Sequence, residues 1–167
     1  MRAVHLRVVE LKRNAQQILE QPPSVSAPDE ERIVEYAAVH PHRAVYFRVD
    51  YGRGADHHAF LDISPLAPGH TLVIPKHVED DYIFHLDEET YAGLWAFARK
   101  VALAVKAAVP CKRVGVAVLG MEVPHTHIHL VPLQTEGDLD FRKQKPVVPE
   151  DEMKRIAASI LSEYEKL

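Results

Sequence analysis

The sequence predicts an α+β fold, with one long helix packed on an antiparallel sheet of about five strands. Short segments rich in β-branched and aromatic residues alternate with turn-forming residues. One apolar stripe at helical spacing runs from Asp87 to about Pro110. The segments on either side of Gly120 and Met121 are joined by a very short turn, which indicates antiparallel pairing.

The expected strands occupy four segments before the histidine-rich stretch. Residues 43–51 and 57–63 flank the turn sequence GRGAD and predict a hairpin. Residues 70–76 form a strand that ends at Pro75. Residues 113–120 have small or apolar side chains on both faces, so we expect a central strand there.

The long helix has the clearest signals. Asp87 is suited to cap it, and Glu88 and Glu89 follow in the first turn. Its stripe consists of Tyr91, Leu94, Trp95, Ala98, Val101, Ala102 and Val105. Amphipathic spacing also predicts helices over residues 3–20 and 29–39, and a last helix that starts near Pro149.

Composition divides the chain and excludes some functions. We expect an N-terminal extension and linker (1–28), a domain (29–142) and a C-terminal helical segment (143–167). The net charge is −4 and no stripe of lysine and arginine is present, so neither nucleic acid nor a membrane surface is an expected partner. The absence of a signal-like or membrane-spanning run, together with a single cysteine, predicts a protein of the reducing cytoplasm.

The stretch PHTHIHLVP places three histidines at alternate positions, His125, His127 and His129. On a strand they share one face, while Ile128 and Leu130 face the core. Three interpretations follow from the residues alone: a polar strand face without a special role, a metal site, or nucleophilic catalysis by the middle imidazole.

A second stretch favours nucleophilic catalysis. AFLDISPLAPGHTLVIPKH (59–77) and GMEVPHTHIHLVP (120–132) together closely resemble the histidine triad (HIT) family of nucleotide hydrolases and transferases. The family motif is His-φ-His-φ-His-φ-φ, where φ is hydrophobic, and Thr126 is the one polar φ here. The resemblance is recognisable from about residue 56 and implies a HIT-like fold with N- and C-terminal helical extensions.

The resemblance implies a mechanism and its residues. His127 attacks the α-phosphorus of a nucleoside phosphate and forms a nucleotidyl-histidine intermediate, with His125, His129 and His70 as the other catalytic residues. The residues implied to bind substrate are Phe60 at the base and Asp62 and Ile63 at the ribose. Glu122 stands where some relatives have a small hydroxyl residue, and we expect it to face away or to hydrogen-bond a triad histidine or a leaving group, without contacting the α-phosphate. The resemblance further implies a homodimer and a small-molecule nucleotide substrate, and we expect no metal and no cofactor.

Some positions depart from the family pattern. Met121 stands where many members have glutamine, and residues 1–56 show no match to the usual family N-terminus. Two alternatives to an enzyme acting on a phosphoramidate or a dinucleoside polyphosphate therefore stay open. One is a nucleotide-binding module without significant turnover, and the other is a metal-dependent hydrolase that uses the three histidines.

Overall fold

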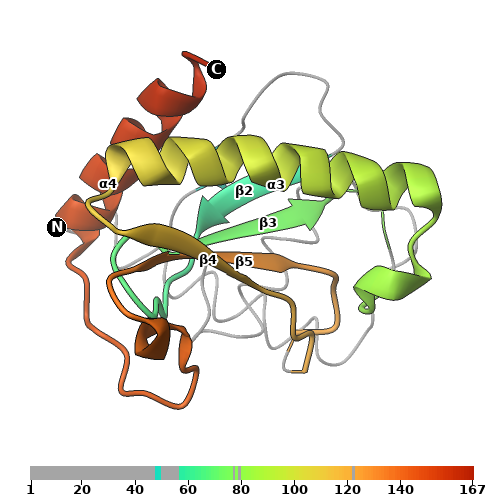
Figure 1. Cartoon of the computed structure of the whole chain (residues 1–167), viewed down its shortest axis with the longest axis horizontal. Helices are drawn as coiled ribbons and strands as arrows, with labels where there is room; N and C mark the ends of the chain where they lie inside the picture. Colours follow the sequence, from blue (N-terminus) through green and yellow to red (C-terminus); the bar gives the residue numbers. More distant parts are fainter. Residues whose placement is uncertain (1–47, 50–56, 77, 79, 122) are drawn as a thin grey trace, which may run out of the picture. The chain divides into compact units, whose positions relative to one another are not determined.

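An antiparallel sheet of five strands, in the order β1-β2-β3-β5-β4, forms the framework of the protein. This computed structural model describes residues 48–49, 57–76, 78, 80–121 and 123–167. Figure 1 shows the sheet beneath the long helix. The strands are β1 (Arg48–Val49), β2 (His57–Leu61), β3 (Thr71–Pro75), β4 (Arg113–Ala117) and β5 (Ile128–Leu133). The α+β class and the antiparallel sheet predicted from the sequence are confirmed.

The predicted hairpin is confirmed where the structure describes it. β1 and β2 pair antiparallel, with Arg48 opposite Phe60 and Val49 opposite Ala59. β3 also matches its predicted segment. The predicted helices at 3–20 and 29–39 and the linker between them lie outside the described residues.

β4 corrects one prediction, because it is an edge strand and not a central one. It pairs with β5 alone, and its burial alternates between exposed and half-buried. Small and apolar residues on both faces are therefore a poor guide to a strand's place in the sheet. The connection to β5 is also longer than predicted and spans residues 118–127, with Gly120 at a positive φ of 68°.

The helix α3 (Glu88–Ala108) covers one face of the sheet and begins at the predicted cap. The Asp87 carboxylate accepts a hydrogen bond from the Thr90 amide at 2.9 Å. The described core lies between this helix and the sheet, and it includes Leu94, Val101 and Val105 of the predicted stripe. Burying each such side chain stabilises the fold by about 1.5–3 kcal/mol.

The C-terminal helix α4 (Glu150–Tyr164) packs beside α3. Met153, Ala157 and Ile160 join the same core, so the predicted apolar face of this helix is confirmed. A shorter helix of 3₁₀ type, η3 (Glu136–Leu139), follows β5, and a second, η2 (Ile83–His85), precedes α3. Within the described ranges, no helix combines the length and the apolar character that crossing a membrane requires.

Strand register arranges the face of the sheet opposite α3. Phe60 of β2 lies opposite Leu72 of β3, and Leu72 lies opposite His129 of β5. In the neighbouring row, Ala59, Val73 and Ile128 alternate to the other side and belong to the core. A continuous row from Phe60 to His129 is therefore presented on the face that the helix leaves uncovered.

The loop between β2 and β3 contains Gly69, whose backbone conformation would be strained in any other residue. Gly69 has a φ of 86°, and a Cβ built on it would lie 2.8 Å from Cγ2 of Val109. Because the next residue is His70, this turn fixes where the first site histidine enters the sheet.

Candidate active site

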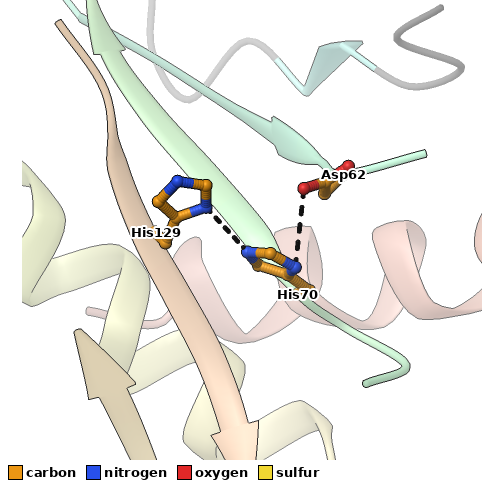
Figure 2. A group of neighbouring side chains, drawn as sticks. All are labelled: Asp62, His70 and His129. Carbon is orange, nitrogen blue, oxygen red and sulfur yellow. Dashed lines mark hydrogen bonds and ion pairs between the residues drawn. The ribbon is translucent and has the colours of Figure 1, made fainter. Parts of the chain in front are cut away.

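Two buried histidines form the interior of the site. His70 precedes β3 and His129 lies in β5, and they are 1 % and 8 % exposed. Nε2 of His70 lies 3.0 Å from Nδ1 of His129, and Figure 2 shows this contact as the link between the two rings. One of these two nitrogens must carry a proton and the other a lone pair.

A backbone amide decides which nitrogen of His70 carries the proton. The Leu66 amide donates a hydrogen bond to Nδ1 of His70 at 3.1 Å. An amide N–H only donates, so Nδ1 carries a lone pair and the proton of the neutral ring is on Nε2. His70 therefore donates to Nδ1 of His129, and His129 carries its own proton on Nε2, at the opposite end of the ring.

Both rings are neutral near pH 7. Burial lowers the pKa of His70 to about 3, with smaller electrostatic contributions from Lys145 and His127. Burial is also the main cause that lowers the pKa of His129 to about 3, with further contributions from the neighbouring histidines. The two hydrogen bonds require the same state, because Nδ1 of His70 must keep a lone pair to accept the Leu66 amide and Nδ1 of His129 must keep one to accept from His70.

His127 is fixed in the opposite tautomer. Its Nδ1 lies 2.7 Å from the carbonyl oxygen of His125, which only accepts, so Nδ1 carries the proton. When the ring is neutral, Nε2 then carries the lone pair, and it has no hydrogen-bond partner among the described residues. The rings of His127 and His129 meet edge to face, with centroids 4.8 Å apart.

His125, the first histidine of the motif, is hydrogen-bonded to the backbone of the next residue. Nδ1 of His125 donates to the carbonyl oxygen of Thr126 at 2.9 Å. Thr126 in turn is tied to the carbonyl oxygen of Asp80 through both its amide (3.1 Å) and its hydroxyl (2.9 Å). The regular strand starts only at Ile128, so the prediction that all three histidines lie on one strand is wrong for His125 and His127.

Asp62 follows β2 and its carboxylate lies beside His70, as Figure 2 shows. Oδ1 accepts the Ser64 amide at 2.8 Å, and Oδ2 lies 3.5 Å from Nδ1 of His70. Because that nitrogen is unprotonated, this approach is not an ion pair. Oδ2 therefore remains available to accept a hydrogen bond beside His70.

For the other predicted substrate residues that it describes, the structure gives burial and position but no hydrogen bond to the histidines. Phe60 is buried in the row that ends at His129, and Ile63 is half-buried next to Asp62. Met121 is 89 % exposed in the connection before the histidines. Glu122 lies outside the described residues, so its assigned role stays a prediction.

Phe141 and the Leu66 amide belong to the site but were not predicted from the sequence. The Phe141 ring meets His129 edge to face at 4.9 Å and His70 at 6.4 Å. It lies in a polar, irregular segment without periodicity, so only the tertiary contact reveals it. A depression of about 660 Å³ lies near Pro124, but three aspartates among its lining residues make it unfavourable for a phosphate.

The low pKa values predict that acid destabilises the protein through His70 and His129. The unfolded chain binds more protons than the folded protein between about pH 6.5 and about pH 3. The free energy of unfolding therefore has its full value above this range and decreases as the pH falls through it. When the pH falls from about 6.5 to about 5.5, the free energy of unfolding decreases by about 2 kcal/mol, because both histidines become protonated in the unfolded chain but not in the folded protein. Urea unfolding at several pH values measures this change.

Two variants make this pH test specific. His129→Asn removes about half of the pH dependence, because one of two titrating rings is gone. His85→Ala, at a histidine that is 64 % exposed, keeps the contribution of both buried rings. Identical pH dependence in all three proteins would contradict the assignment of neutral buried rings.

The chain is similar in sequence to a family model and to several known proteins. A family model described as the HIT domain matches residues 52–136. An uncharacterised HIT-like protein of Saccharolobus solfataricus is 36 % identical over 104 residues, which cover 58 % of this chain and 70 % of that protein. The bis(5'-adenosyl)-triphosphatase of Dictyostelium discoideum is 28 % identical over 58 % of this chain and 66 % of its own length. The adenosine 5'-monophosphoramidase of Saccharomyces cerevisiae is 32 % identical over 47 % of this chain and 50 % of its own length.

Solved structures show the same fold. A hypothetical histidine triad nucleotide-binding protein of Sulfolobus tokodaii superimposes with a TM-score of 0.58 at 27 % identity, over 78 % of this chain and 91 % of that one. A zinc-bound histidine triad family protein of Mycobacterium smegmatis gives a TM-score of 0.56 at 27 % identity, over 75 % of this chain and 91 % of its own. The family match over more than half of the chain and the agreement in fold show that this chain belongs to the HIT domain family.

Proposed function

We propose that this protein is a nucleotide hydrolase or nucleotidyltransferase in which His127 is the nucleophile. The observation that carries the proposal is the tautomer of His127: Nδ1–H donates to the His125 carbonyl at 2.7 Å, which leaves the lone pair of the neutral ring on Nε2. A neutral imidazole fixed in this way is a competent nucleophile. The two enzymatic relatives named above support a nucleoside phosphate as substrate.

The first step forms a bond between Nε2 of His127 and the α-phosphorus. As that bond forms, the bond from phosphorus to the leaving group breaks and its electron pair departs with the leaving group. The ring then carries a positive charge, which its Nδ1–H shares with the His125 carbonyl. In the second step, water attacks the phosphorus and the bond to Nε2 breaks, so that Nε2 regains its lone pair. The proton that the water loses passes to solvent and balances the proton that the departed leaving group takes up.

His129 supplies a hydrogen-bond donor to this reaction. Its Nδ1 accepts from His70, so its proton is on Nε2, and its ring meets that of His127. A neutral N–H next to the nucleophile can donate to a phosphoryl oxygen as negative charge develops. His70 acts through His129, because it fixes the tautomer that makes this donor.

The rest of the row fits a nucleoside. The Asp62 carboxylate is placed to accept hydrogen bonds from ribose hydroxyls through Oδ2, and Ile63 lies next to it. Phe60 is the proposed wall of the base pocket, in the same row as His129. Glu122 is proposed to face away from the α-phosphate or to meet the leaving group.

Metal-dependent hydrolysis is a second candidate function, because Asp62, His70 and His129 could hold an ion. Their ligand atoms lie within 4.8 Å of one another. However, a metal there would have to displace the Leu66 amide from His70 or break the bond between the two rings. We therefore favour the imidazole nucleophile and expect no metal.

A homodimer through α3 and the edge strand β4 is also proposed. β4 has one pairing side unused within the described sheet. Exposed apolar side chains occur on both elements, at Leu103 and Val116. Edge pairing with a second copy would bury this surface and satisfy the unpaired backbone groups of the strand.

His127→Ala is predicted to lower turnover of adenosine 5'-monophosphoramidate and of diadenosine triphosphate by at least about 10³-fold, because the nucleophile is lost. Circular dichroism should show an intact fold. Mass spectrometry of the wild-type protein during turnover should detect a covalent nucleotidyl group that is absent from the variant. His85→Ala serves as the control and keeps wild-type rates.

Activity of His127→Ala within tenfold of wild type would contradict the mechanism. A wild-type protein that binds these nucleotides without turnover would instead support the nucleotide-binding module.

Chelation is predicted to leave activity unchanged, because the nucleophile is an imidazole and not a metal-bound hydroxide. The test compares initial rates before and after dialysis against EDTA, with zinc measured by elemental analysis on the same samples. One zinc per chain that is lost together with the activity, and restores it on return, would favour the metal-dependent alternative.

Light scattering is predicted to give twice the chain mass of 18.8 kDa at micromolar concentration. Val116→Glu, which places a charge on the edge strand, should give the monomer mass. Val147→Glu changes a valine that is 95 % exposed in the segment before α4, and should leave the dimer intact. A wild-type monomer would contradict the proposed assembly.

A further inference from the structure

Thr126 is the one polar residue at the hydrophobic positions of the histidine motif, and it is fully buried. Its hydroxyl donates a hydrogen bond to the carbonyl oxygen of Asp80 at 2.9 Å, and its amide donates to the same oxygen at 3.1 Å. A hydrophobic residue at this position would keep the amide bond but would lack the hydroxyl bond. The hydroxyl bond is therefore a feature of this chain that the motif itself does not require.

The Asp80 carbonyl belongs to a segment that is fixed by its own contacts. The Asp80 carboxylate accepts the Tyr82 amide at 2.8 Å, which holds the local turn. Ile83 follows and is 1 % exposed in the core. Gly120 also approaches this segment, since a Cβ built on it would lie 3.0 Å from the carbonyl oxygen of Asp81. The connection between β4 and β5 therefore packs against the same anchored segment at two points.

The amide of Thr126 and the carbonyl of His125 belong to one peptide group. A peptide group is planar, so fixing the direction of its N–H also fixes the direction of its C=O. That carbonyl accepts the hydrogen bond from Nδ1 of His127 at 2.7 Å. A continuous chain of hydrogen bonds therefore runs from the Asp80 carbonyl through this peptide group to the ring of His127.

The hydroxyl makes this chain of hydrogen bonds firmer. With the amide bond alone, the residue could pivot about the Asp80 oxygen, and the peptide plane would turn with it. Two bonds from Thr126 to one acceptor prevent this rotation. Hydrogen bonds at the two ends of one peptide group also strengthen each other, because each polarises the group in the same direction. The His125 carbonyl is then a stronger acceptor for Nδ1–H of His127.

We propose that Thr126 is a positioning residue for the nucleophile, because its hydroxyl holds the His125 carbonyl against Nδ1–H of His127. The effect on rate rests on the proposed function, in which Nε2 of His127 attacks phosphorus. As that bond forms, positive charge develops on the ring, and Nδ1–H donates more strongly to a carbonyl that is already in place. Thr126 acts only through this carbonyl and is not itself a catalytic residue.

Thr126→Val tests the proposal in the free protein, because valine has nearly the same shape and lacks the hydroxyl donor. The Asp80 carbonyl keeps the backbone amide of residue 126 as a partner, so no buried acceptor is left unsatisfied. NMR measures how fast the Nδ1 proton of His127 exchanges with water. We expect this exchange to become about 3- to 10-fold faster in Thr126→Val, the effect typical of losing one hydrogen bond.

The kinetic test uses adenosine 5'-monophosphoramidate as substrate. Thr126→Val should lower kcat by about 3- to 10-fold and leave KM within about twofold of wild type, because the nucleophile is held less firmly while substrate contacts are retained. Thr126→Ser keeps the hydroxyl and should restore both kcat and the exchange rate. Thr126→Ala should change both in the same direction as Thr126→Val, so the result does not depend on how valine packs.

Thr71→Val is the matched control for the exchange measurement. Thr71 is also buried, and its hydroxyl also donates to a backbone carbonyl, that of Gly69, at 2.9 Å. Urea unfolding should show a similar loss of stability in Thr71→Val and Thr126→Val. Only Thr126→Val should change the exchange of the Nδ1 proton of His127.

Unchanged exchange of the Nδ1 proton in Thr126→Val would overturn the proposal, and so would an unchanged kcat. An equal change of exchange in Thr71→Val would also overturn it, because lost stability alone would then explain the effect. A wild-type protein without turnover would refute the proposed function. The exchange rates would still decide whether Thr126 holds the ring of His127.

Discussion

The buried hydrogen bond between His70 and His129 is the interaction on which the site depends. It joins a loop to the central part of the sheet across 3.0 Å, and it is possible only while both rings are neutral. Its direction originates in one backbone amide, that of Leu66, which takes the Nδ1 lone pair of His70. That amide determines the position of the proton on His129, and with it the hydrogen-bond donor beside the proposed nucleophile. This one backbone contact fixes the tautomer of His70, and His70 in turn fixes the tautomer of His129.

The fold supplies the constraints that keep this chain of hydrogen bonds in register. The antiparallel pairing of β2, β3 and β5 aligns Phe60, Leu72 and His129 in one row and directs their neighbours into the core beneath α3. A shift of one residue in this register would move His129 into the apolar core and end the row. At the loop, the positive φ of Gly69 brings His70 to the start of β3. Stability and function therefore share the same residues, since the strand that buries Ile128 also presents His129.

Much of the fold and part of the site could be predicted from the sequence. Amphipathic spacing and the Asp87 cap locate α3 because local physics determines them, and the apolar face of α4 follows in the same way. The sequence could not place β4, because residues compatible with burial are also compatible with an edge that another chain covers. It also misplaced the start of the histidine strand, since the hydrogen bonds from Thr126 to the Asp80 carbonyl join segments that are distant in sequence. Phe141 and the Leu66 amide lie in segments without periodicity, and only tertiary structure brings them to the rings.

The central claim is that backbone groups fix His127 and His129 in opposite tautomers, so that a lone pair and a proton face the same substrate. Nitrogen-15 NMR of the imidazole rings near neutral pH measures this directly, because protonated and unprotonated ring nitrogens have well-separated chemical shifts. The account predicts a neutral His129 with its proton on Nε2, and a His127 whose neutral form carries its proton on Nδ1. Assignments would come from the spectra of His127→Ala and His129→Asn. The same tautomer for both rings, or an imidazolium at His129, would contradict the account.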